Sequence, residues 1–212
     1  MGLFDRIRKP SNIKEERNED KIAKLIETLD DLDTQTQWEV IPLLGESGDK
    51  RCVEPLIAFI TQPNKHSHSL KLAMDALVNL KDPRAIEPII IAFKKKEQHA
   101  TISHFYEFGD IALEPLLSVI NDENEKLRSE AIYALGYLKN PKAVNPLIQA
   151  LINDNGKGFF GKDNDNRNRA AYALEQIGEP SVAALESLKD HENSVVRELA
   201  LESLEGIANS NE

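Results

Sequence analysis

Residues 127–154 read LRSEAIYALGYLKNPKAVNPLIQALIND, which is the pattern of two amphipathic helices joined by a short turn. Apolar residues recur at spacings of three and four in each half, so they lie on one face of each predicted helix. Asn140-Pro141, between the halves, combines a capping side chain with a proline at the start of the second helix. Neither helix can bury its apolar stripe alone, so this unit must stack against others. The stripes are Leu127, Ala131, Leu135 and Leu138 in the first helix and Val144, Leu147, Ile148 and Leu151 in the second.

The same unit returns along the chain, and we call its first helix A and its second helix B. A segment that reads small, apolar, polar, proline, apolar, apolar begins at Cys52, Ala85, Ala112 and Ala143, and a weaker copy without proline begins at Ser181. The shared prolines lie 33, 27 and 31 residues apart, which is the length of a two-helix repeat. Because proline inside a regular helix removes a hydrogen bond and clashes, the pattern predicts either a kink there or a short turn before the helix proper. The prolines are Pro55, Pro88, Pro115 and Pro146.

Residues 126–154 resemble the HEAT-like repeat of the phycobilin-lyase (PBS lyase) type, and the resemblance extends over residues 33–208. It implies an all-α fold, a right-handed α-solenoid of about five to six HEAT-like helix pairs. It also implies a ladder in which an arginine early in helix A pairs with an acidic or amide residue near the end of the previous helix B. Leu70 and Gln98 stand where earlier repeats would need the arginine, so we expect the ladder only in the C-terminal half. The matching arginines are Arg128, Arg167 and Arg197, with Asp122, Asp165 and Asp190 as candidate partners.

The chain divides into one folded unit with free ends. Residues 1–18 read as a flexible tail, although their mixture of apolar and basic residues is also compatible with a short amphipathic anchor. Residues 19–208 are predicted to form a single solenoid, with a helix at 19–32 capping its first repeat and an inserted loop at 156–166. Residues 209–212 read as a second tail.

The composition restricts the classes of partner. The formal net charge is −10, which disfavours nucleic acid and anionic membrane surfaces. No apolar run is long enough to span a membrane, and the N-terminus lacks a signal-peptide pattern, so we expect a cytoplasmic protein. The single cysteine, Cys52, cannot form an internal disulfide and reads as a small buried hydrophobe.

Two features are candidate contacts for a protein or peptide. The repeat alignment places Glu54, Glu87 and Glu114 in one row on the helix B face, and we call these three residues the acidic row. It favours a basic or amphipathic partner, but charge is also the ordinary surface of a solvated helix. The second feature is Phe159 and Phe160 in the inserted loop, which either dock back on the protein or contact a partner. Asn145, Ile91 and Gln149 complete the predicted contacts on the helix B face.

The third repeat carries aromatic residues where the other repeats have alanine and leucine. HATISHFYEFGD, residues 99–110, places Phe105, Tyr106 and Phe108 in this helix A. Rings in such a stripe usually fill space, which predicts a repacked core. A bend or a partner pocket is the alternative interpretation.

No cluster of residues predicts chemistry. The five histidines do not form a metal-ligand spacing, and His191-Glu192 is the only His-Glu pair, unlike the several that hold iron in the HEAT-like enzyme deoxyhypusine hydroxylase. HEAT-like DNA glycosylases use a basic groove, which the charge disfavours. We therefore expect no metal, no cofactor and no enzymatic activity, but a scaffold or adaptor that binds a protein or peptide through its helix B face and residues 156–161. The alternative is a lyase-type enzyme, or a subunit of one, acting on a tetrapyrrole or related cofactor.

Overall fold

The computed structural model describes residues 18–30, 32–63, 65–96, 102–153 and 165–210. In these ranges every regular element is helical, which confirms the all-α prediction. The helices form five consecutive A/B pairs with one further helix at each end. The end helices are α2 (Asn18–Thr28) and α12 (Ser194–Asn209). The pairs are α3 (Thr34–Glu46) with α4 (Val53–Thr61), α5 (Ser67–Leu80) with α6 (Ile86–Lys96), η3 (Ser103–Ala112) with α7 (Leu113–Val119), α8 (Glu125–Leu138) with α9 (Val144–Asn153), and α10 (Asp165–Ile177) with α11 (Val182–Glu186).

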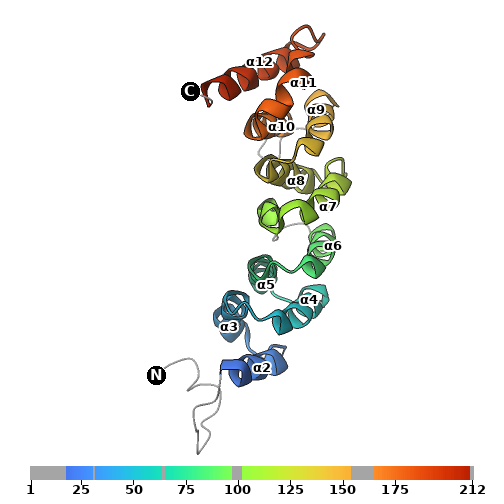
Figure 1. Ribbon diagram of the computed structural model, residues 1–212. Helices are drawn as coiled ribbons and strands as arrows, with labels where there is room; N and C mark the ends of the chain where they lie inside the picture. The colour runs from blue at the N-terminus through green and yellow to red at the C-terminus, as the bar shows by residue number, and fades with distance from the viewer. Residues whose placement is uncertain (1–17, 31, 64, 97–101, 154–164, 211–212) are drawn as a thin grey trace, which may run out of the picture.

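The pairs stack in chain order into an elongated column (Figure 1). Helices α3, α5, η3, α8 and α10 form the A row, and α4, α6, α7, α9 and α11 form the B row on the other side. Within the A row each helix packs on the next, as α3 does on α5 and α8 on α10. Each layer therefore buries the apolar stripe of its neighbours, which is the arrangement of an α-solenoid and confirms the predicted architecture.

A capped 3₁₀ turn precedes the α-helical part of helix B. In the second repeat the Asp82 carboxylate accepts a hydrogen bond from the backbone N–H of Arg84, and α6 begins only at Ile86. Pro88 is then the third residue of α6, where the missing N–H is one that has no intrahelical partner. Of the two predicted alternatives, the structure therefore shows the short turn and not the kink. The same device recurs as Asp49 with η1 (Lys50–Cys52) and Asn140 with η4 (Pro141–Ala143), while η2 is Pro83–Ala85 and η5 is Glu179–Ser181.

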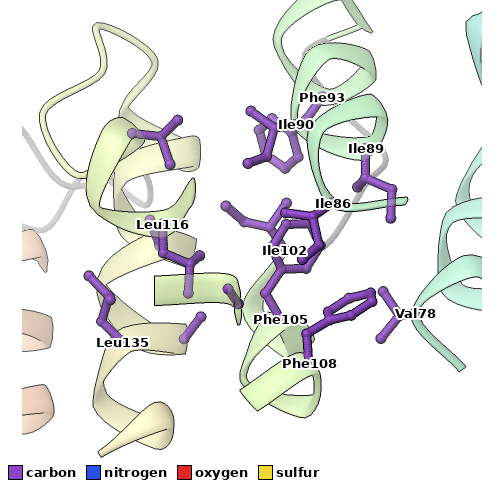
Figure 2. Packing of buried hydrophobic residues seen from close by; sticks show 14 of the residues in the cluster. Val78, Ile86, Ile89, Ile90, Phe93, Ile102, Phe105, Phe108, Leu116 and Leu135 are labelled. Atoms are coloured by element: carbon purple, nitrogen blue, oxygen red, sulfur yellow. The ribbon is translucent and has the colours of Figure 1, made fainter. Parts of the chain in front are cut away.

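The aromatic residues of the third repeat are divided between core and surface. Figure 2 shows Phe105 and Phe108 among Ile86 and Phe93 of α6 and the apolar residues of α7 and α8. Their rings meet edge to face with centroids 5.5 Å apart, a favourable aromatic geometry. These two residues therefore fill the core as predicted, whereas Tyr106 is only half-buried. This helix A is a 3₁₀ helix, and Gly109 interrupts it with a φ of 66° and a ψ of −152°, a backbone conformation that glycine adopts without strain.

Two glycines allow neighbouring A helices to approach closely. A Cβ placed on Gly45 of α3 would lie 2.6 Å from the Cα of Ala76 in α5. A Cβ placed on Gly136 of α8 would lie 2.8 Å from the Cα of Ala173 in α10. Both distances are shorter than van der Waals contact, so these positions in the stack require the absence of a side chain.

The predicted ends and loop are only partly described. The capping helix expected over 19–32 is α2, and its Leu25 is buried against the first repeat. Residues 1–17, 154–164 and 211–212 lie outside the described residues, and so do Phe159, Phe160 and nearly all of the predicted loop 156–166. Across the described helices, none has both the length and the apolar character needed to cross a membrane.

Candidate functional site

The acidic row lies on the exposed side of the B helices. Glu54, Glu87 and Glu114 are each exposed and each stand in the first turn of their helix, α4, α6 and α7. Asn145, the second residue of α9, is exposed at the equivalent position. A carboxylate in the first turn also stabilises its helix through the helix dipole, so these residues have a structural role as well.

Glu54 is partly neutralised by the next repeat. The Arg84 guanidinium donates to Glu54 Oε1 at 2.8 Å and to Asp82 Oδ1 at 2.9 Å. The hydrogen bond from the Arg84 side chain is the main cause that lowers the pKa of Asp82 to about 2. Arg84 thus links two repeats and caps the turn, and Glu54 offers a partner less negative charge than its exposure suggests.

A second line of B-row residues is exposed beside the acidic row. Ile91 of α6 is 39% exposed, which is unusual for a large aliphatic side chain on a helix whose other isoleucines are buried. Gln149 of α9 is exposed, and its Oε1 accepts a hydrogen bond from Asn153 at 3.0 Å. Lys94, at the end of α6, binds the Asp122 carboxylate at 2.8 Å and so connects to the third repeat. The predicted helix B residues are therefore accessible, but they form a line and not a pocket.

The three arginines of the expected ladder hold backbone carbonyl groups of the segment that precedes their own helix. Arg128 donates to the carbonyl oxygens of Asp122 and Glu123 at 2.8 and 3.1 Å. Arg197 donates in the same way to His191 and Glu192 at 2.5 and 3.0 Å. Arg167, which is buried, donates to the Ile152 carbonyl at 3.1 Å.

These contacts close the connection from helix B to the next helix A, where helix-end carbonyls need partners. Among the acidic candidates, Asp122 binds Lys94. Burial opposes ionisation of Asp122, but the hydrogen bond from Lys94 outweighs it with help from the charge of Arg128, so the pKa of Asp122 is lowered. Asp190 is exposed, and the side chain of Asp165 lies outside the described residues. The arginines therefore read as structural residues that set the spacing of successive repeats.

A cluster of tyrosines lies on the A row. The chain has four tyrosines, and all four are in contact: Tyr106 of η3, Tyr133 and Tyr137 of α8, and Tyr172 of α10. We call them the tyrosine cluster. The Tyr137 ring lies 4.6 Å from the Tyr133 ring and 5.3 Å from the Tyr106 ring, measured between centroids. Tyr172 is 43% exposed and the other three are half-buried, so the cluster is at the surface.

The Tyr137 hydroxyl is the centre of this cluster. It lies 3.5 Å from the Tyr172 hydroxyl and is also hydrogen-bonded to Tyr133. Hydrogen bonding to Tyr137 raises the pKa of Tyr133 to about 12 and also raises the pKa of Tyr172. Hydrogen bonding with Tyr133 and Tyr172 lowers the pKa of Tyr137, and the nearby Lys139 lowers it further. Either hydroxyl of the Tyr137–Tyr172 pair can be the donor.

The tyrosine cluster was not predicted from the sequence, although the sequence contains a signal for it. Ala131–Leu135 reads AIYAL and Ala170–Leu174 reads AAYAL, so Tyr133 and Tyr172 occupy equivalent positions in two successive A helices. Tyr137 follows Tyr133 by four residues, which places both on one helix face. Only Tyr106 of the cluster was noted, as a residue of the aromatic third repeat.

The described residues contain no other constellation that suggests a reactive centre. Within them no group of three or more His, Cys, Asp or Glu side chains could hold a metal ion. Cys52 is fully buried, and burial raises the pKa of its thiol, which disfavours the nucleophilic thiolate.

Comparison with known proteins places the repeats in context. Residues 113–205 match a family model of HEAT repeats, and residues 72–95 match the PBS lyase HEAT-like repeat. Bilin biosynthesis protein PecE from Nostoc sp. (strain PCC 7120) is 25% identical over 140 residues, which is 64% of this chain and 55% of PecE. The chain thus spans about half the length of this curated relative.

Two solved structures match at low identity and with TM-scores below 0.5. Human deoxyhypusine hydroxylase, in complex with glycerol, matches with a TM-score of 0.41 and 19% identity, covering 89% of this chain and 84% of that chain. The designed armadillo repeat protein YIII(Dq)4CqI matches with a TM-score of 0.41 and 16% identity, covering 88% of this chain and 99% of that chain.

These relatives correct one expectation. From the sequence we expected no enzymatic activity, with a lyase-type enzyme as the alternative. The similarity to a bilin biosynthesis protein and the match to the PBS lyase repeat point instead toward an enzyme-related role. The error came from reading the lack of a catalytic motif as lack of a reaction, whereas a repeat surface can serve chemistry without a short motif.

Proposed function

Because residues 113–205 match HEAT repeats and residues 72–95 match the PBS lyase HEAT-like repeat, we propose that this chain acts in bilin metabolism as a lyase-type enzyme or a subunit of one. The observation that carries this proposal is the similarity to bilin biosynthesis protein PecE over 140 residues. The match of residues 72–95 to the PBS lyase HEAT-like repeat supports the same proposal.

The geometry is compatible with such a role. A bilin is an open-chain tetrapyrrole, a long conjugated molecule with carbonyl oxygens at its ends, and it needs an extended surface with aromatic and polar groups. The solenoid has two rows of helices, and each row has its own outer side (Figure 1). The A row carries the tyrosine cluster, of which Tyr172 is exposed, and the B row carries exposed carboxylates. One face can therefore hold a ligand while the other contacts a protein.

We further propose that the helix B face is the protein-binding side. Glu87 and Glu114 are exposed at equivalent positions of successive B helices. Ile91, which is 39% exposed, adds an apolar group to the same surface. A basic segment with an apolar side chain complements this combination, since charges steer association and an aliphatic contact adds affinity. Glu54 contributes less, because Arg84 already binds it.

Addition of a bilin to the purified chain tests the first proposal. Biliverdin, used as the probe, is expected to change its visible absorption spectrum on binding and to co-elute with the protein in gel filtration. A spectrum that is unchanged by excess protein, with all biliverdin eluting free, would contradict a role in bilin handling.

Charge reversal tests the protein-binding side. Glu87→Lys combined with Glu114→Lys is expected to reduce recovery of a partner co-purified from the native host, and the loss should be larger at low salt because the contact is electrostatic. Glu39→Lys, at an exposed position on α3 in the A row, is the matched control. Equal recovery by the double variant and the control would refute the acidic row as a contact.

A further inference from the structure

The last helix of the column leaves two leucines incompletely covered. Leu201 of α12 is 46% exposed, and Leu204, three residues later, is half-buried. Both are at positions that the other α-helical members of the A row bury, since Leu204 follows Arg197 by seven residues as Leu174 follows Arg167. The counterparts of Leu204 are Leu44, Leu77, Leu135 and Leu174, those of Leu201 are Ile41, Met74, Ile132 and Ala171, and all of them are buried.

The difference lies in what comes after α12. Each of the other four helices is followed by a helix B and then, in the next layer, by another helix A. Within the described residues no helix follows α12, which lies across the end of the column (Figure 1). Its inner side is occupied, because it packs on α10 and α11, and the Ser203 hydroxyl donates to the Ala171 carbonyl oxygen at 3.1 Å. The leucines therefore lie where a further layer would stack.

The surroundings of these leucines are acidic. Glu198 and Glu205 are exposed one turn to either side of Leu201, and Glu202 is exposed next to it. None of these three carboxylates forms an ion pair with another described residue. Residues 179–209 contain seven acidic and two basic side chains, a net charge of −5 and half of the −10 of the whole chain. Such a surface attracts a basic partner and repels an acidic one.

This charge argues against a second copy of the chain as the occupant. Two α12 helices packed face to face would bring the glutamates of both copies together. The opposite end of the column is no better, because Glu39 and Glu46 are exposed on α3. Like charges brought together at an interface oppose association, so both arrangements are disfavoured.

We propose that this side of α12 is a docking surface for a basic amphipathic helix of a partner protein, and we call it the end surface. It consists of Leu201, Leu204, Glu198, Glu202 and Glu205. The partner helix stacks where the next layer would lie, with its apolar stripe on the two leucines and its lysine or arginine side chains beside the glutamates. The end surface is separate from the acidic row of the B helices, so the proposal does not depend on the role in bilin metabolism.

A synthetic amphipathic peptide, added to the full chain, tests the end surface. The probe is a fluorescently labelled peptide of about four helical turns, with leucines at helical spacings of three and four and lysines elsewhere. A peptide of the same composition whose leucines form no stripe is the control probe, since it has the same charge. Fluorescence anisotropy is expected to show binding of the amphipathic peptide that is tighter by roughly tenfold, because only its stripe covers both leucines.

Variants of α12 locate the peptide. Leu201→Gln keeps a good helix former and removes the apolar contact, so the affinity should fall by roughly fivefold to tenfold. Glu198→Lys combined with Glu205→Lys should weaken binding by about tenfold or more at low salt and by less at high salt. Hydrogen exchange of the α12 amides should slow when the peptide binds the wild type.

The helix α3 provides matched controls at the other end of the column. Leu43 is 40% exposed, and Glu39 and Glu46 have the same seven-residue spacing as Glu198 and Glu205. Leu43→Gln, and Glu39→Lys combined with Glu46→Lys, should therefore bind the peptide like the wild type. Circular dichroism is expected to be the same for all variants, because each changes exposed side chains only.

Three results would overturn the end surface, and each leaves the bilin role standing. The first is no binding by the wild type, or a loss that is equal in the α3 and α12 variants. The second is normal binding by the α12 variants with a loss in Glu87→Lys combined with Glu114→Lys, which would place the peptide on the acidic row. The third is self-association of the wild type that Leu201→Gln removes, measured by sedimentation, which would make a second copy the occupant.

Discussion

Substitution of Gly136 by alanine measures how tightly the A helices are stacked. The new Cβ would lie 2.8 Å from the Cα and 2.9 Å from the Cβ of Ala173, so α8 and α10 must separate by roughly half an ångström or more to regain van der Waals contact. Overpacking against backbone costs about 1–3 kcal/mol, while replacement of a helical glycine by alanine returns about 1 kcal/mol of helix propensity. Because the Cα of Ala173 cannot rotate away, we expect a cost in the upper part of this range, about 2–3 kcal/mol, and hence a net loss of about 1–2 kcal/mol in the free energy of unfolding.

Gly206→Ala is the matched control, because it changes the same atoms in α12, the end helix that packs on α10. Its Cβ would lie 2.5 Å from Cδ of Glu175, the far end of a flexible side chain that can rotate away. The helix propensity then dominates, and the variant should be more stable than wild type by up to about 1 kcal/mol.

Thermal and urea denaturation of the two variants and wild type give the result. We expect the melting temperature to fall by about 3–6 °C for Gly136→Ala and to rise by about 1–3 °C for Gly206→Ala. If Gly136→Ala were as stable as wild type, or if both variants shifted in the same direction, the close approach of α8 and α10 would not be what requires glycine.

Three further predictions follow from caps and links between repeats. Asp82→Asn keeps the capping oxygen but loses the ion pair with Arg84, so it should cost about 1–2 kcal/mol at neutral pH. Because folding lowers the pKa of Asp82 from 3.8 to about 2, this difference from wild type should be complete above pH 4 and disappear as the pH falls toward 2, in acid titrations of stability. Lys139 ends α8 with a φ of 52°, which glycine adopts more easily than lysine. Lys139→Gly should therefore stabilise the protein by about 0.5–1 kcal/mol in urea denaturation. Equal stability of the variant and wild type would argue against backbone strain at this position. Glu130→Ala leaves the backbone N–H of Ile102 without its carboxylate partner at 2.6 Å, and hydrogen exchange of η3 should become faster, whereas unchanged exchange would show that this contact does not hold the third repeat.

The fold could be predicted because each repeat specifies itself locally. The apolar spacing fixes two helices, and a capping residue such as Asp82 or Asn140 fixes where the turn begins. The sequence left a kink and a short turn as alternatives, because proline is tolerated in both. Only the structure shows that the short turn is formed. The third repeat was less predictable, because its 3₁₀ geometry depends on how Phe105 and Phe108 fit between α6 and α8.

The candidate site was predictable only in part. The acidic row repeats at one position of helix B, so alignment of the repeats was enough to place Glu87 and Glu114 on one surface. The tyrosine cluster combines residues from different positions of three A helices, and one of them, Tyr106, comes from the 3₁₀ helix η3. Contacts of this kind depend on the rotation of one layer relative to the next, which a single sequence does not contain.

The absence of a central nucleus in this column has a mechanical consequence. Each layer is held only by the layers next to it, so a rotation of a degree or two at every junction leaves each contact almost unchanged while the distance between the two tips changes greatly. The molecule is therefore elastic along its length in the way of a coiled spring. Groups on adjacent layers, such as the rings of α8 and α10, keep their spacing during such bending, whereas a large ligand or partner that touches distant layers would set the curvature of the whole column.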